Sequence, residues 1–485
     1  MKSIAACAAA LLSLISPIVT ADTNVAGPSV SKATLPSTFK PPQVFKNANL
    51  VHVISLEKNF AKEQINVVVE NDSKEPQDEY FLPFTSQQME RVGGFEVKDR
   101  KDSSLTGFVV EAVEYDPFST IESDCLRRSH LRLNRRLASR LDTPPAAIQQ
   151  TDKQYLVYSF SAYCPSIYTT VKQKTEVKLP GSDIPEYTKI ASSGDVKEFP
   201  QKSGAKLTYG PFHEVPAGAV SPVKVRYEFT KPVSHVTLLE RDVEVSHWGG
   251  NIAFEERYTL YNQGANLSAL FNRVKWAQSQ YFNPNSYALK EMKFPLRIGS
   301  TDAYFTDAIG NVSTSRFRSN KKEASLEIKP RYPIFGGWKY PFTIGWNADA
   351  KYFLRQKTGD SYILNIPFLE GPKQPEGFGY EQVQVRVLLP EGAENVKFHT
   401  SIPESSITDV VVDQQKTYLD TIGRTVLTIK ARNLHDDFRD RDLIVSYDYT
   451  FAASLRKPLV VFGSMMSLFV GIWLLSKVDV KLSSK

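Results

Sequence analysis

The side chains that most often carry chemistry are scattered along this sequence and form no recognised catalytic pattern. No two of its seven histidines stand at the spacing of a zinc-binding pair. They are His52, His130, His213, His235, His247, His399 and His435. The sequence also lacks a nucleophile elbow, a zinc-protease helix motif, a P-loop and a dinucleotide fingerprint. We therefore predict no catalytic residue, no cofactor and no metal site; a metal site assembled from distant residues is the alternative.

One acidic pattern has a form known from glycosyl transfer. Asp440-Arg441-Asp442 is a D-x-D triplet, which sugar-nucleotide transferases use to hold a divalent cation. It lies in the charged run 435–442, just ahead of the last expected strand. The favoured interpretation is a solvated charged turn.

Two cysteines are candidates for a disulfide. Cys7 lies in the apolar N-terminal stretch, which leaves Cys125 and Cys164. In an oxidising compartment their pairing would close a loop of about 40 residues and contribute roughly 3–4 kcal/mol. Two buried free thiols are the alternative.

Three sequons permit N-linked glycans. They begin at Asn71, Asn266 and Asn311. Each would mark a surface position if used, and Gly310 favours a turn at the third.

Two segments are candidates for surface contacts. The run 126–140 holds six arginines. On a helix its leucines would form an uneven apolar stripe, and the run could then meet anionic lipid headgroups or an acidic neighbour. A solvated insertion between strands is the favoured interpretation. The second segment, 330–346, is hinged at Gly336-Gly337 and rich in aromatic residues. A core strand pair is its favoured interpretation, and a subunit or acceptor-peptide contact surface is the alternative, formed by Tyr332, Phe335, Trp338 and Trp346.

Strand signals dominate the elements that must position these residues. Period-two or β-branched runs recur along the chain, separated by Gly, Pro, Asn and Asp. The expected strands are 51–56, 64–70, 108–113, 154–161, 223–230, 383–389 and 443–450. Helical periodicity is weak outside 126–140 and 265–280. The sequence predicts a mainly β protein built of antiparallel sandwich-type domains.

Similar segments recur in the same order in the two halves, which indicates two related β domains, 47–232 and 233–456. The matched pairs are 67–71 with 258–262, 177–181 with 387–392, 204–208 with 423–428, and 223–230 with 443–450. Roughly 435 residues between the terminal apolar segments also exceed one ordinary core. The net charge of +6 is small and dispersed, so no nucleic-acid partner is expected.

The two ends of the chain predict a single-pass membrane protein. Residues 1–21 have the charge, apolar run and small-residue cleavage site of a secretory signal peptide. An extended arm is expected over 22–46, a transmembrane helix over 457–476 and a short cytosolic tail over 477–485. Gly463, Ser467 and Gly471 would form a ridge on the helix where another helix can pack; chance placement is the alternative.

Several longer motifs resemble the ribophorin I family, subunits of the oligosaccharyltransferase complex of the endoplasmic reticulum (ER). The motifs are 241–249 (RDVEVSHWG), 304–315 (YFTDAIGNVSTS), 328–338 (IKPRYPIFGGW), 389–393 (LPEGA) and 418–424 (YLDTIGR). Clear resemblance covers about residue 223 to the membrane helix. The arginine-rich run has no familiar counterpart, and the short tail places direct ribosome docking in doubt.

The resemblance implies a non-catalytic, single-pass type I subunit with its bulk in the ER lumen. Its complex transfers a preassembled glycan from dolichyl diphosphate to Asn in N-x-S/T, with catalysis in a polytopic partner. The implied partners are that subunit, other subunits of the complex, ER lipids and nascent polypeptides. A lumenal cargo receptor or chaperone is the alternative function, and a stand-alone lumenal enzyme is a third.

Overall fold

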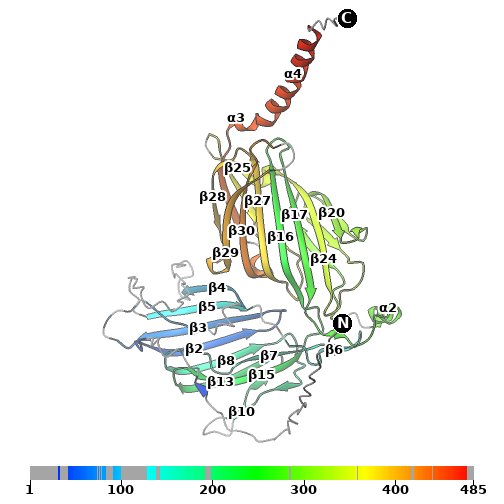
Figure 1. The fold of residues 1–485 in the computed structure, drawn as a ribbon. Coiled ribbons are helices and arrows are strands. Elements are labelled where there is room, and N and C mark those ends of the chain that lie inside the picture. The colour runs from blue at the N-terminus through cyan, green and yellow to red at the C-terminus, as the bar shows by residue number, and fades with distance from the viewer. Residues whose placement is uncertain are drawn as a thin grey trace, which may run out of the picture.

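The computed structural model describes residues 31–32, 42–73, 75, 77, 79–83, 91–99, 128–137, 142–191, 198–282, 286–357, 359–416, 420–439 and 441–477. In these residues two β-rich domains follow one another, and a long helix extends from the second domain at the end remote from the first (Figure 1). The mainly β prediction is confirmed. The expected signal peptide, the strand 108–113 and almost all of the tail lie outside the described residues.

The first domain packs two sheets around one core. The larger sheet has the order β12-β13-β8-β2-β3-β5-β4, and the smaller has the order β7-β15-β9. The bounds of the larger sheet are β2 (Phe45–Ser55), β3 (Ala61–Asn71), β4 (Val92–Asp99), β5 (Arg128–Leu137), β8 (Thr170–Lys178), β12 (Gln201–Ser203) and β13 (Lys206–Val215). Those of the smaller sheet are β7 (Tyr155–Ser161), β9 (Glu186–Tyr187) and β15 (Pro222–Glu228). Alternate residues of both sheets, such as Val177, Leu207 and Val225, meet between them and are buried.

Short strands complete this region. Ser31–Lys32 (β1), in the expected N-terminal arm, pairs with Ala219–Val220 (β14). Ile190–Ala191 (β10) pairs with Glu198–Phe199 (β11), and Ala147–Ile148 (β6) pairs with Asn266–Leu267 (β18) of the second domain.

The second domain is built around an eight-stranded sheet of order β21-β20-β24-β17-β16-β27-β30-β29. Its bounds are β16 (Ser234–Ser246), β17 (Asn251–Asn262), β20 (Thr301–Asp307), β21 (Gly310–Asn311), β24 (Lys339–Asp349), β27 (Gly379–Glu391), β29 (Ile407–Gln415) and β30 (Arg424–His435). A four-stranded sheet, β25-β26-β31-β28, and a three-stranded sheet, β19-β23-β22, share its core. Their bounds are β19 (Met292–Leu296), β22 (Arg316–Ser319), β23 (Ala324–Ile328), β25 (Leu354–Gln356), β26 (Ser361–Pro367), β28 (Glu394–Thr400) and β31 (Asp442–Asp448). Short 3-10 turns lie at Ala350–Tyr352, Glu404–Ser406 and Asp436–Phe438.

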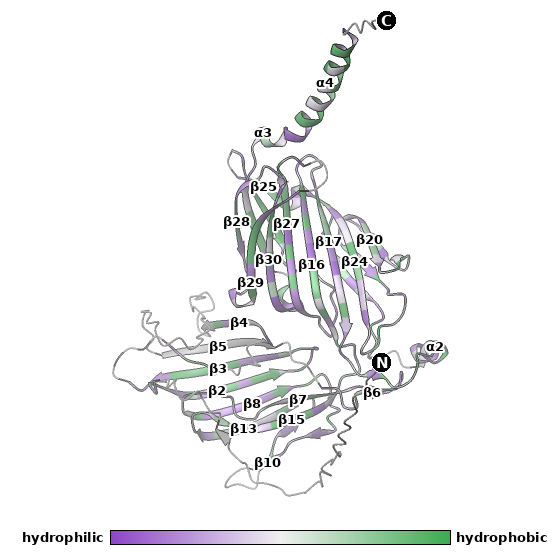
Figure 2. Cartoon of the chain, viewed as in Figure 1, coloured by the Kyte–Doolittle hydropathy of each residue, from purple (hydrophilic) through white to green (hydrophobic). Residues whose placement is uncertain are grey.

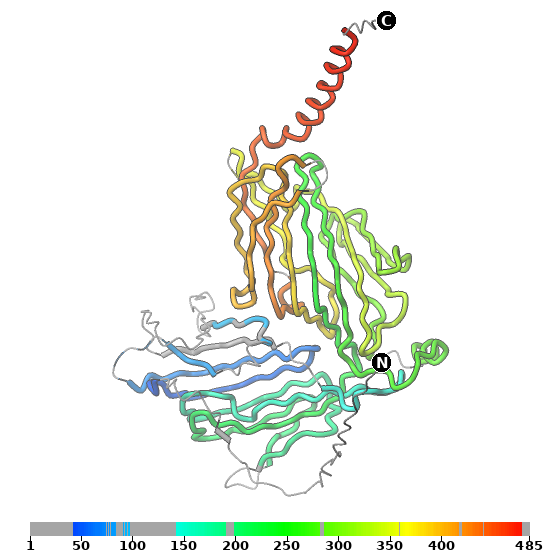
Figure 3. Tube along the Cα trace, viewed as in Figure 1, coloured from blue at the N-terminus to red at the C-terminus, as the bar shows by residue number. Residues whose placement is uncertain are grey.

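The two large sheets share one strand topology, visible in the chain trace of Figure 3. In the first, β3, β2, β8 and β13 are neighbours; in the second, β17, β16, β27 and β30 are neighbours. The only parallel pairs in these two sheets, as far as the described residues show, are β2 with β8 and β16 with β27, which are equivalent. Three of the four pairs of similar segments therefore fall on equivalent strands of the large sheets, and the fourth pair falls on β15 and β31 of the smaller sheets. Each large sheet is mixed rather than purely antiparallel.

The first residues of the charged run, 435–438, lie at the contact between the domains, so the interpretation as a solvated turn was wrong for them, whereas Asp442 is exposed. Lys58, in the turn after β2, donates to Asp436 and to Asp437 at 2.8 Å each. Phe60 stacks on the buried ring of His435, with centroids 4.2 Å apart. The carboxylates pair with lysines of the other domain because the turn after β30 packs against the turn between β2 and β3. Asp440 itself lies outside the described residues.

The arginine-rich run contains a paired strand, so neither the favoured solvated insertion between strands nor the alternative helix describes it. Residues 128–137 form β5, paired with β3 on one side and β4 on the other. Leu131 and Leu133 are two apart, so the segment satisfies the strand period as well as a helical stripe, and the neighbouring strands decide between the two. The other expected helix begins later, as α2 (Arg273–Phe282), because Asn272 caps it by accepting from the backbone N–H groups of Val274 and Lys275.

The chain ends in the short helix α3 (Phe451–Ser454) and then α4 (Arg456–Ser476). Its 21 residues extend about 30 Å, the thickness of the hydrocarbon core of a bilayer. Figure 2 shows α4 as a mainly apolar element projecting from the mixed surface of the domain. Its apolar side chains are exposed, as expected of a membrane-spanning helix.

Candidate functional site

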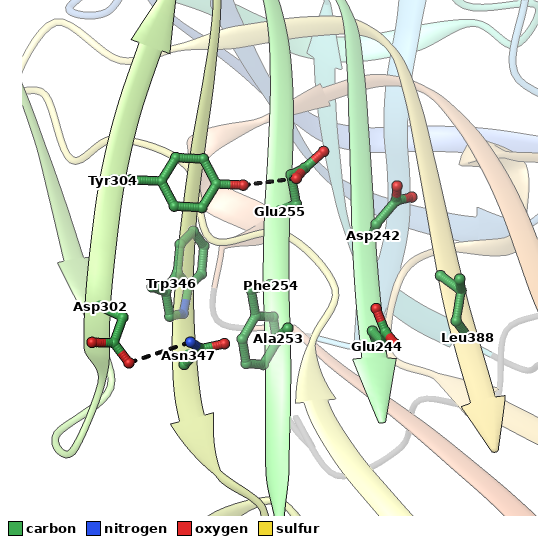
Figure 4. A pocket seen from close by; sticks show the side chains of 10 residues that line it. All are labelled: Asp242, Glu244, Ala253, Phe254, Glu255, Asp302, Tyr304, Trp346, Asn347 and Leu388. Atoms are coloured by element: carbon green, nitrogen blue, oxygen red, sulfur yellow. Dashed lines mark hydrogen bonds between the residues drawn. The ribbon is translucent and has the colours of Figure 1, made fainter. Parts of the chain in front are cut away.

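The first six residues of the motif 241–249 lie in β16, and their side chains therefore alternate between the two faces of the eight-stranded sheet. Arg241 and Val243 point into the core, whereas Asp242 and Glu244 point outward because side chains alternate along a strand. The outward residues border a shallow depression of about 250 Å³ (Figure 4). Its lining residues are Asp242, Glu244, Ala253, Phe254, Glu255, Asp302, Tyr304, Trp346, Asn347 and Leu388.

Tyr304 reaches across this face from β20. Its ring lies over Gly345 of β24, where any side chain would collide with it, and its hydroxyl donates to Glu255 Oε2 at 2.7 Å. Burial, followed by the hydrogen bond to Glu255, raises the pKa of Tyr304. The phenol is therefore held protonated as a donor, which favours a positioning contact over proton transfer.

The carboxylates of this face are paired with arginines. Asp242 accepts from Arg257 Nη2 at 2.7 Å and from Arg386 Nε at 2.6 Å. Arg424 pairs with Glu244 at the end of the strand. These contacts form a ladder of ion pairs across β17, β16 and β27. Such a surface suits docking of another polar surface, because its charged groups are already fixed in direction.

On the opposite side of the same strand, Arg241 is the centre of a buried ionic cluster. It pairs with Glu256 of β17 and donates to Glu370 Oε2 at 2.9 Å. Tyr258 donates to the other oxygen of Glu256 at 2.5 Å. Burial raises the pKa of Glu256, and the Arg241 charge opposes that rise. The cluster ties the segment after β26 to the sheet and has a structural role, because Arg241 and Glu256 are sealed from solvent.

The end of the motif meets the start of the membrane segment. Trp248 lies at the tip of the β16–β17 hairpin, is 68% exposed, and donates through Nε1 to the carbonyl of Ser454 at 2.8 Å. His247 bonds the hydroxyl of Tyr447 at 2.7 Å, and burial lowers its pKa. Beyond α3, Lys457 pairs with the buried Asp420. The hairpin thus fixes the direction in which α4 leaves the domain.

The aromatic segment 330–346 divides between interior and surface. Phe335 and Trp346 are buried in the core, in agreement with the favoured strand interpretation. Tyr332 is 40% exposed, and Trp338 is half-buried beside it. The contact-surface hypothesis stays a prediction for these last two residues.

The other predicted residues lie far apart. Asn266 and Asn311 are exposed, and Asn71 is half-buried.

Cys164 is buried in the first domain, whereas Cys125 lies outside the described residues, so the disulfide stays a prediction. In α4, no atom lies within 4 Å of a Cβ built at Gly463 or Gly471, and Ser467 is exposed between them, so the packing ridge also stays a prediction. The described residues contain no group of three His, Cys, Asp or Glu placed to hold a metal.

Sequence reasoning missed the ion-pair ladder and the buried cluster. The available signal was the alternation of charged and apolar residues in 241–245 and 254–258. That alternation marks the faces of a strand but does not show which strands become neighbours.

The family comparison and the curated relatives point to the same family. The family described as Ribophorin I matches residues 45–476. A Caenorhabditis elegans protein named dolichyl-diphosphooligosaccharide–protein glycosyltransferase subunit 1 is 35% identical over 73% of this chain and 58% of its own length. The subunit 1 of Schizosaccharomyces pombe is 29% identical over 86% of this chain and 92% of its own. A solved M1 zinc metallopeptidase from Deinococcus radiodurans has 12% identity and a TM-score of 0.25, over 44% of this chain and 42% of its own, a likeness too low to support a conclusion.

Proposed function

This chain belongs to the ribophorin I family, and from that premise we propose that it is a non-catalytic subunit of the ER oligosaccharyltransferase complex. The complex would transfer a preassembled glycan from dolichyl diphosphate to Asn in N-x-S/T, with catalysis in a polytopic partner. The observation that carries the proposal is the family match over both β domains and the apolar helix. In this proposal the bulk of the chain faces the ER lumen, and α4 crosses the membrane once.

The architecture suits a subunit that positions other components. The ion pairs of Lys58 and the stack of Phe60 on His435 join the two domains. The bond from Trp248 to Ser454 joins the β16–β17 hairpin to α3, which leads into α4. An element docked against α4 would therefore share a fixed geometry with both domains. The face bearing Asp242 and Glu244 offers a polar contact for a neighbouring subunit or a nascent polypeptide.

The surface of α4 that would meet a partner helix is the ridge of small residues. Gly463 and Gly471 lie eight residues apart on one face, with Ser467 between them. Small side chains let two helix backbones approach closely in lipid, where packing drives association. The lipid-exposed remainder of the helix would anchor the subunit in the ER membrane.

Native purification in mild detergent tests the proposal. A tagged full chain should co-purify with the polytopic transferase and with glycan-transfer activity. Gly463→Leu with Gly471→Leu should reduce this recovery and leave the thermal unfolding of the lumenal domains unchanged. The matched control is Leu459→Ile, which alters an exposed apolar residue of the same helix without filling the ridge.

Two results would overturn the proposal. One is a monomer that has hydrolase activity of its own, which would favour a stand-alone enzyme. The other is recovery with cargo glycoproteins and coat components in place of the transferase, which would favour the receptor alternative.

A further inference from the structure

An open aromatic groove of about 480 Å³ lies at the start of β24, near the pairing of β18 with β6 of the first domain. It is lined by Phe271, Tyr332, Trp338 and Lys339. The Trp338 ring lies edge-on to its neighbours, with its centroid 5.6 Å from that of Tyr332 and 6.3 Å from that of Phe271.

The sequon residue Asn266 is not one of the lining residues, but it lies against Gly337, the residue that precedes Trp338 in the chain. It lies in β18, held by the backbone pairing with Ala147 and by a bridge to Gly336. Its side-chain oxygen occupies the space that a Cβ at Gly337 would fill, and Gly337 has a φ of 80°. Glycine at this position therefore lets the Asn266 amide lie against the backbone next to Trp338. Asn266 as a whole is exposed to solvent.

The other two sequons have different surroundings. The amide of Asn71 is engaged locally, donating to the carbonyl of Glu75 at 2.8 Å and accepting from the N–H of Ser73 at 2.8 Å. Asn311 is exposed on the β20–β21 hairpin, where its carbonyl accepts from Arg331 at 3.1 Å, and the residues next to it in the chain, Gly310 and Val312, are not aromatic. Asn266 thus combines an exposed position with a nearby aromatic groove.

We propose that Asn266 carries an N-linked glycan whose first N-acetylglucosamine packs into this groove against Tyr332 and Trp338. One face of a pyranose ring presents C–H groups of partial positive charge, which are attracted to the negative face of an aromatic ring. Lys339 supplies a hydrogen-bond donor at the rim for the sugar hydroxyls or the acetamido carbonyl.

The covalent step is transfer from a lipid diphosphate-linked glycan. A bond forms between Asn266 Nδ2 and the anomeric carbon of the sugar, while the bond from that carbon to the diphosphate oxygen breaks. The lipid diphosphate leaves with the electron pair of the broken bond, and the proton lost by the amide nitrogen is taken up by this diphosphate or by water. This inference rests on the lumenal orientation in the proposed function, because only lumenal sequons meet the donor.

The test compares glycan accessibility at two sites of the same full chain. The protein is purified in mild detergent, digested with an endoglycosidase under native and denaturing conditions, and analysed by peptide mass. We expect Asn266 to be occupied, and its native deglycosylation to be about tenfold slower than that at Asn311, or about 1.4 kcal/mol of protection. Denaturation should abolish the difference.

Two groove variants and one control identify the cause of protection. Tyr332→Ala and Trp338→Ala should bring the rate at Asn266 close to the rate at Asn311. Tyr281→Ala, which removes an aromatic residue that is 85% exposed on α2 and outside the groove lining, should leave it slow. If Trp338→Ala does not fold, the more exposed Tyr332→Ala still carries the test.

The contrary results are distinct. An unmodified Asn266 beside an occupied Asn311 overturns the inference and leaves the lumenal orientation standing. Equal native rates at the two sites also overturn it, because the sugar would then lie outside the groove. Absence of glycan from all three sequons contradicts the lumenal orientation as well.

Discussion

Replacing Asp307 by asparagine should loosen the hairpin that displays Asn311. The carboxylate of Asp307 is 3% exposed and accepts from Arg331 Nε at 2.5 Å, from Tyr340 Oη at 3.0 Å and from the Ile309 N–H at 2.9 Å. Arg331 also donates to the carbonyl of Asn311 at 3.1 Å. Asparagine keeps the size of the side chain and removes its charge, so the variant isolates the electrostatic contribution.

The magnitude follows from the pKa. The hydrogen bond from Arg331, with smaller contributions from Tyr340 and the backbone, lowers the pKa of Asp307 from 3.8 to about 2. At about 1.4 kcal/mol per unit, this depression corresponds to roughly 2 kcal/mol of stability in the ionised form. Arg331 is 34% exposed, so solvent screening reduces the expected loss in Asp307→Asn to about 1–2 kcal/mol.

The same pKa fixes the sign of the pH dependence. A lowered pKa means that the stabilisation is present above 3.8, the ordinary value, and is lost as the pH falls through about 2. Urea unfolding of the full chain in detergent, followed by tryptophan fluorescence, should therefore show wild type more stable than Asp307→Asn near neutral pH. The two proteins should converge near pH 2.

Asp302→Asn is the matched control. Asp302 lies in the same strand and contacts the side chain of Asn347 at 3.4 Å, so its loss should stay within about 0.5 kcal/mol. A difference between wild type and Asp307→Asn that is constant from neutral pH to pH 2 would refute the electrostatic reasoning.

Three further predictions concern the core, the domain contact and the sheet face. Glu256→Ala should lower the free energy of unfolding in urea by about 3–5 kcal/mol, because it leaves Arg241 in the core with one carboxylate fewer. The control is Thr259→Ala at a half-buried position of the same strand. A loss in Glu256→Ala no larger than the loss in this control would contradict the structural role of the cluster. Phe60→Ala removes the ring that stacks on His435. Amide hydrogen exchange over residues 435–438 should therefore become faster, while exchange in β16 and β17 stays unchanged. Unchanged exchange in both regions would show that the stack does not hold the domains together. Gly345→Ala should displace the Tyr304 ring from Glu255 and lower the stability measured by thermal unfolding by about 1 kcal/mol. The stability losses of Gly345→Ala and Tyr304→Ala should not add in the double variant. Additive losses would exclude the clash between the two side chains.

Local sequence signals were sufficient for the broad architecture. Strand alternation, turn residues and one uncharged C-terminal segment predicted a mainly β protein with one apolar helix, and long motifs identified the family. Each of these signals lies within a short stretch of chain. The run 126–140 shows the limit of such signals, because its leucines satisfy two periods and only pairing with β3 and β4 makes it a strand.

The sites depended on contacts between segments remote in sequence. Arg241 and Asp242 are adjacent in the chain, yet one enters a buried cluster with Glu370 and the other joins an exposed ladder with Arg386. Asp436 was misjudged as solvated because its partner Lys58 belongs to the other domain. Asn266 was recognisable as a sequon, but Tyr332 and Trp338 reach its side only through the fold.

By itself the sequence determined which residues face inward, where the chain turns, which segment can cross a membrane and to which family the chain belongs. Only the tertiary structure decided which charges are paired, which aromatic residues stay open and how the two domains contact each other. The physical reason is that successive side chains of a strand point to opposite faces of the sheet, so the sequence pattern shows which side chains share a face. The backbone N–H and C=O groups along a strand edge are the same for every sequence, so they do not select the neighbouring strand. The partner of each strand is therefore chosen by packing over the whole domain.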